Sequence, residues 1–118
     1  MKTTKKQFKI FKDECQKWID YFGLKEYRIE IFQNESANSS RAETEDYNNL
    51  MALDIIFPTD LHKETDIGKI KMAAFHEICE GLLMRTRMMA EKYYNWDIVD
   101  KEIHTIIRKL ENCIFKNL

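Results

Sequence analysis

The chain has 118 residues, of which 44% are hydrophobic and 12% aromatic. This is enough apolar surface for one folded domain but hard to divide between two. The 19 lysine and arginine residues nearly balance the 20 aspartate and glutamate residues, so the overall charge gives no reason to expect a nucleic acid or an anionic membrane as a partner. We therefore expect a single domain over residues 1–118.

The sequence also indicates where the protein resides. It has no apolar run near the ~20 residues that span a bilayer, and its N-terminus lacks the apolar segment and cleavage site of a secretory signal. Its three cysteines are widely spaced and form no C-x-x-C pair, which argues against a disulfide framework or a cysteine-rich zinc knuckle. We interpret Cys15, Cys79 and Cys113 as buried, reduced thiols and predict a cytoplasmic protein without a membrane partner. The oligomeric state is not readable from the sequence.

The first elements follow from hydrophobic periodicity. Residues 4–22 place apolar side chains at three- and four-residue intervals, which predicts a helix, and Gly23 follows as a C-terminal stop. The lysines near the N-terminus then form the solvated face of this helix rather than a nucleic-acid-binding arm. Residues 27–32 alternate apolar and polar side chains, which indicates a half-buried strand, and residues 34–40 read as a loop.

The remaining elements complete an α+β domain. Strands are predicted within 41–47 and 50–57, joined near Asn48 and Asn49, with Pro58 closing the second. Together the three strands would form a small antiparallel sheet. A long helix, capped by Thr65 or Asp66, is expected to continue to about residue 92, and a last helix to run from about 96 to 116. Both tryptophans, Trp18 and Trp96, are assigned to the core.

The long helix carries the residues to which we assign chemistry. It has two apolar stripes, one formed by Ile67, Ile70, Ala74, Ile78 and Leu82 and the other by Met72, Ala73, Cys79 and Leu83. Such a helix is expected to be central and buried. His76 and Glu80 lie within the second stripe, one turn apart on the same face. Burying a carboxylate without a partner costs several kcal/mol, so this pair requires a hydrogen-bonding network, a salt bridge or a metal ion.

A divalent cation would satisfy both polar groups together. Histidine and glutamate are common zinc ligands, and Glu77 stands next to His76, where the H-E-x-x-H motif of zinc hydrolases places the general base. In such hydrolases the metal acidifies a bound water molecule, and the base accepts its proton. The sequence therefore predicts a metal-binding helix with Glu77 in the catalytic role.

A catalytic zinc site has three protein ligands as a rule, so one more is needed. The last helix offers Glu102 and His104. These two residues flank its apolar stripe from opposite sides, and periodicity does not choose between them. Ligand chemistry favours His104, because two histidines and one carboxylate compose a known class of hydrolytic zinc site. The predicted metal ligands are His76, Glu80 and His104.

This arrangement resembles the minimal zincin-like metallopeptidases, which include small phage-encoded and SprT-like proteins. The resemblance covers about residues 27–114 and depends on the segment H-E-I-C-E at 76–80 followed by a final helix beginning near His104. Similar small phage proteins carry H-E-x-x-H with a glutamate near the position of His104. The resemblance implies that Glu80 and His104 have exchanged residue types within a three-ligand site, and it implies a peptide or protein substrate.

Two functional hypotheses follow. The first is a zinc-dependent hydrolase, most simply a metallopeptidase, with His76, Glu80 and His104 as ligands and Glu77 as general base. The second is a non-catalytic zincin-like interaction module or phage accessory protein, in which the same residues form a buried polar network. Metal content distinguishes the two hypotheses.

Overall fold

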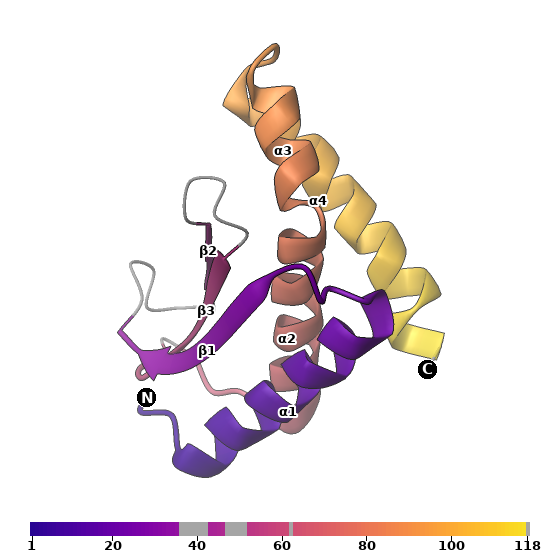
Figure 1. The fold of residues 1–118 in the computed structure, drawn as a ribbon. Coiled ribbons are helices and arrows are strands. Elements are labelled where there is room, and N and C mark those ends of the chain that lie inside the picture. Colours follow the sequence, from indigo (N-terminus) through magenta and orange to yellow (C-terminus); the bar gives the residue numbers. More distant parts are fainter. Residues whose placement is uncertain (36–42, 47–51, 62, 118) are drawn as a thin grey trace.

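The computed structural model describes residues 1–35, 43–46, 52–61 and 63–117, and for 43–46 it describes the backbone. The elements, in chain order, are α1 (Lys5–Phe22), β1 (Arg28–Asn34), β2 (Glu43–Asp46), β3 (Ala52–Pro58), α2 (Ile67–Leu82), α3 (Met84–Glu91), α4 (Trp96–Cys113) and a 3-10 turn, η1 (Phe115–Asn117) (Figure 1). The α+β class is as predicted. The predicted turn near Asn48 and Asn49, and residues 36–40 of the predicted loop, lie outside the described residues.

The sheet differs from the prediction. Its strand order is β1-β3-β2, with β3 in the centre. β1 and β3 are parallel, with Ile31 opposite Ile55, whereas β2 is antiparallel to β3, with Thr44 opposite Ile55. The predicted three-stranded antiparallel sheet was therefore wrong. Side-chain alternation identifies a strand by its exposed and buried faces, but it carries no information about the direction of the neighbouring strand.

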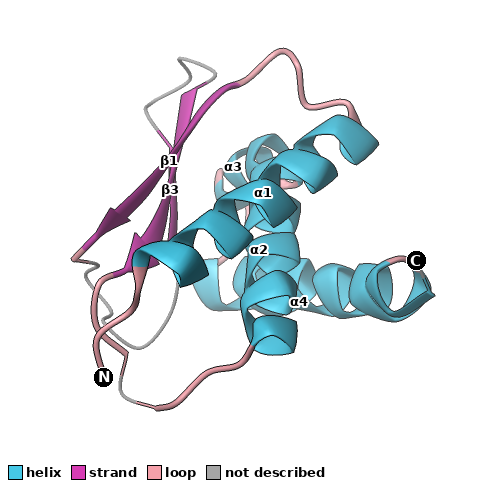
Figure 2. Cartoon of the chain, turned by 90° about the horizontal axis from the view of Figure 1, so that it is seen from below, coloured by secondary structure: helices cyan, strands magenta, loops and turns pink. Residues whose placement is uncertain are grey.

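The helices of the described residues lie on one side of the sheet (Figure 2). The central strand β3 turns Leu53, Ile55 and Phe57 into the core, where each is at most 3% exposed. Helix α1 contributes Phe11 and Trp18 to the same core, and α2 runs between α1 and α4. The prediction that the long helix is central is confirmed for α2, whose buried residues are Ile70, Ala74, Phe75, Glu77, Ile78, Cys79 and Gly81. It was wrong for α3, which has no buried residues.

The ends of the first two helices show how local sequence sets their limits. Thr4 and Gln7 form a reciprocal capping box at the start of α1. Gly23 ends that helix with a φ of 66°, a left-handed conformation that glycine adopts without steric cost. Of the two predicted caps of α2, Asp66 is the one used, because its side chain accepts a hydrogen bond of 2.9 Å from the backbone N–H of Lys69.

The long helix predicted to reach residue 92 is interrupted at Leu83. This residue has φ −97° and ψ 3°, so the chain changes direction there, and α2 ends at Leu82 while α3 begins at Met84. Backbone hydrogen bonds continue across the break, from Leu83 N–H to the Cys79 carbonyl and from Arg87 N–H to the Leu83 carbonyl. The pattern of apolar residues therefore continues from α2 into α3 and does not indicate that the helix axis changes at Leu83.

Two predictions about burial need correction. Cys15 and Cys79 are fully buried, but Cys113 is exposed at the end of α4. Trp18 is 1% exposed and belongs to the core, whereas Trp96 is 61% exposed at the start of α4. Both exceptions lie at a helix end, where periodicity no longer distinguishes a core position from a surface one. Among the described residues, no helix has the length and apolar character needed to cross a bilayer.

Helix α2 approaches the sheet closely at Gly81. A Cβ atom at this position would lie 2.9 Å from the Cδ1 atom of Leu53, which is itself 1% exposed. The glycine therefore allows the helix turn that carries Glu80 to approach β3. This contact fixes the C-terminal part of α2 against the sheet.

Candidate metal centre

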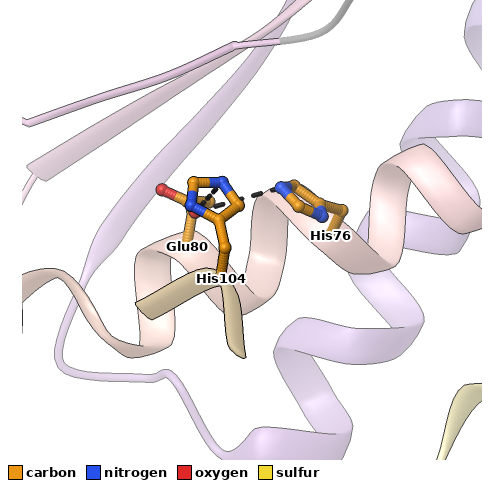
Figure 3. Close-up of side chains that lie close together, drawn as sticks. All are labelled: His76, Glu80 and His104. Carbon is orange, nitrogen blue, oxygen red and sulfur yellow. Dashed lines mark ion pairs between the residues drawn. The ribbon is translucent and has the colours of Figure 1, made fainter. Parts of the chain in front are cut away.

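Three side chains from two helices converge beside α2. His76 and Glu80 extend from the same face of α2, and His104 reaches toward them from α4 (Figure 3). Their candidate ligand atoms all lie within 4.8 Å of one another. The Oε1 atom of Glu80 is 3.5 Å from His104 Nε2 and 3.9 Å from His76 Nε2. The structure thus brings together the three residues predicted as metal ligands.

The spacing and chemistry of this group fit a metal ion. Two ligands bound at about 2.1 Å to one tetrahedral ion are about 3.4 Å apart, close to the distances from Glu80 Oε1 to the two imidazoles. Glu80 Oε1 is buried and has no hydrogen-bond partner among the described residues. A buried carboxylate oxygen without a partner is costly, and a cation between it and the imidazole nitrogens would satisfy it. The group could therefore hold a metal ion.

The hydrogen bond of His104 Nδ1 favours the tautomer in which Nε2 is free of hydrogen and can bind a metal ion. Its Nδ1 atom lies 2.9 Å from the backbone oxygen of Asp100, one helical turn earlier. A carbonyl oxygen only accepts, so Nδ1 is the donor and carries the hydrogen. In the neutral imidazole the lone pair is then on Nε2, the atom that faces Glu80.

Arg87 balances part of the negative charge around Glu80. Its guanidinium group lies 3.4 Å from Glu80 Oε2, 3.1 Å from Asp100 Oδ1 and 3.7 Å from Glu91 Oε1. The linked set therefore contains three carboxylates and one guanidinium, which leaves a net negative charge when the histidines are neutral. Such an environment favours a divalent cation over an additional anion.

The two other candidate residues lie outside this three-residue group. Glu77 is 8% exposed, and its position next to His76 in α2 turns its side chain about 100° around the helix axis from that of His76. Burial raises the pKa of the Cys15 thiol, and the negative charges of Glu77 and Glu14 raise it further. Glu77 thus belongs to the buried interior near α1. Glu102 is exposed on α4, away from the three converging side chains.

Sequence reasoning gave no role to two residues of this centre, Arg87 and Asp100. Asp100 precedes His104 by four residues, the spacing of one helical turn, so this contact was in principle readable from the sequence. Arg87 follows Glu80 by seven residues, or two helical turns, so its place on the same face was also readable from the predicted helix, whereas its ion pair with Asp100 depends on the packing of α3 against α4.

Comparisons of the chain with models of protein families, with curated proteins and with solved structures found no match. The resemblance to zincin-like metallopeptidases therefore stays a prediction from the motif and the residues around it.

Proposed function

We propose that His76, Glu80 and His104 bind a zinc ion and that the protein is a zinc-dependent hydrolase, most simply a metallopeptidase acting on a peptide or protein substrate. The observation that carries the proposal is the Oε1 atom of Glu80, which is buried, has no hydrogen-bond partner in the part of the chain that the structure describes, and faces two imidazole Nε2 atoms. Two nitrogens and one carboxylate oxygen match the donor set of hydrolytic zinc sites.

The proposed reaction assigns a role to each side chain. When bound, zinc would supply the Lewis acidity that makes a water molecule acidic near neutral pH. Glu77 would accept the proton of that water, the role that the general base has in the H-E-x-x-H motif. His76 and His104 are 31% and 35% exposed, so solvent can reach their side of the centre.

The direct test of metal binding is the metal content of protein purified without chelator. We expect about one zinc per chain, and a rise in the free energy of unfolding of about 2.7 kcal/mol when free zinc exceeds its Kd 100-fold. Elemental analysis and thermal unfolding with and without zinc would measure both quantities. A stoichiometry near zero after reconstitution, with no thermal shift, would contradict the proposal.

A second candidate function is supported by the ion pairs of Arg87. Because Arg87 contacts both Glu80 and Asp100, the centre also resembles a salt-bridge network between helices. In that case the protein would be a non-catalytic interaction module, and the histidines would be part of the network. The metal-content measurement separates this candidate from the zinc hydrolase.

The role of Glu77 can be tested separately from metal binding. Glu77→Gln should retain zinc and the fold, yet lose hydrolysis of a fluorescence-quenched casein substrate, since an amide does not accept the water's proton at neutral pH. Glu80→Ala is the matched variant on the same helix and should lose zinc. If instead Glu77→Gln loses zinc while Glu80→Ala retains it, the two carboxylates have the opposite roles.

A further inference from the structure

Arg87 joins the three helices that surround the candidate metal centre. It lies in α3, just after the change of direction at Leu83, and its side chain is only 12% exposed. Its ion pairs extend to Glu80 on α2, to Glu91 on α3 and to Asp100 on α4. An arginine this buried, with three carboxylate partners, has little freedom to leave the centre.

The two oxygens of Glu80 have different environments because of this arginine. Oε2 is 3.4 Å from Arg87 Nη2, on one side of the carboxylate. Oε1 faces the two histidines and accepts no hydrogen bond from any described residue. A free carboxylate can bind a cation through one oxygen or through both. Here the guanidinium engages one oxygen and leaves the other for a cation.

Arg87 also acts on the second helix of the site through Asp100. The Oδ1 atom of Asp100 lies 3.1 Å from Arg87 Nη2 and 3.4 Å from His104 Nδ1. The guanidinium group of Arg87 therefore contacts the Asp100 carboxylate, which lies beside the Nδ1 atom of His104. Groups that hold a ligand in this way tune the affinity and geometry of a metal site.

We propose that Arg87 is a positioning residue that restricts Glu80 to one coordinating oxygen and thereby gives the site its preference for a four-coordinate metal such as zinc. The inference rests on the proposed metal site. Zinc sites with three protein ligands and one water are tetrahedral. Manganese and calcium instead prefer six or more ligand atoms, most of them oxygen. Without Arg87, the second oxygen of Glu80 becomes available, and the site can accept the higher coordination numbers.

The test compares the full chain with Arg87→Met, which removes the charge while keeping much of the side-chain length. Arg85→Met is the matched control, because Arg85 lies two residues before Arg87 on α3 and is exposed. Cobalt(II) serves as the probe, since its visible absorption is strong at a four-coordinate site and weak at a higher-coordinate one. The Kd values for zinc and manganese are measured alongside by competition with a chromophoric chelator.

We expect Arg87→Met to bind one metal ion per chain with weakened cobalt absorption, and its preference for zinc over manganese to fall by at least ~10-fold. Arg85→Met should match the parent in both measurements. If Arg87→Met does not fold, Arg87→Gln, which keeps a hydrogen-bond donor but no charge, is used instead. It should likewise weaken the cobalt absorption and lower the preference for zinc over manganese.

The outcomes separate this inference from the proposed function. A parent protein that binds zinc, together with an Arg87 variant whose cobalt spectrum and metal preference are unchanged, overturns the role of Arg87 alone. A parent protein that binds neither zinc nor cobalt overturns the metal site and this inference with it.

Discussion

His104→Ala should lower the zinc affinity of the protein by more than ~100-fold, which exceeds the usual cost of losing a group that only orients a ligand. The expectation follows from geometry, because His104 Nε2 lies 3.5 Å from the Oε1 atom of Glu80 and comes from a different helix than the other two ligands. Without it, two ligands on one face of α2 remain. Competition with a chromophoric chelator would measure the change in Kd.

Glu102→Ala is the control on the same helix. Glu102 is exposed, so its loss should change the Kd by no more than about twofold, well below the effect of losing a residue that holds a ligand. Circular dichroism of the metal-free variants would establish that both are folded. If His104→Ala binds zinc as tightly as the parent, His104 is not a ligand, and the network of ion pairs around Arg87 becomes the better account of the centre.

Phe75→Ala should produce the largest loss of stability among core substitutions on α2. Phe75 is fully buried and contacts three aromatic rings, those of Trp18 at 4.7 Å, Phe115 at 5.3 Å and Phe22 at 5.9 Å between centroids. Truncating a buried phenylalanine costs about 3–5 kcal/mol, because apolar burial is lost and a cavity remains. Domains of this size are stable by only about 5–15 kcal/mol, so the variant should be close to unfolding.

Chemical denaturation of the metal-free protein would measure this effect without a contribution from metal binding. Tyr93→Ala is the matched control, since it also removes an aromatic ring, but Tyr93 is 84% exposed and its loss should change the free energy of unfolding by less than ~0.5 kcal/mol. Similar midpoints for Phe75→Ala and the parent would show that the aromatic cluster contributes little to stability.

Part of the candidate site could be predicted from the sequence because two of its three residues lie on one helix. His76 and Glu80 are one helical turn apart, so their common face follows from helix geometry alone. His104 was chosen over Glu102 on ligand chemistry, and the structure places His104 beside Glu80 and leaves Glu102 exposed. Arg87 lies seven residues after Glu80, a spacing that places both on one helix face, but its ion pair with Asp100 depends on the packing of α3 against α4, which the sequence pattern does not encode.

The fold was predictable to the level of its elements but not of their pairing. Alternation identified β1, and the apolar run ending at Phe57 identified β3. The parallel pairing of these strands depends on contacts between residues far apart in the chain, such as Ile31 and Ile55, which no local pattern encodes. Trp96 was assigned to the core together with Trp18, yet it is 61% exposed at the start of α4, where periodicity does not distinguish a core position from a surface one.

The distribution of the three candidate ligands along the chain constrains when a metal site could form during folding. His76 and Glu80 are on one helix, but His104 joins them only when α4 has docked against α2. If the group binds a cation as proposed, the two donors of α2 alone would bind it weakly and would not nucleate the structure. The buried residues Val99, Ile103 and Ile107 of α4 supply apolar contacts for docking that need no ion. Binding of the proposed ion would then follow the formation of the hydrophobic core.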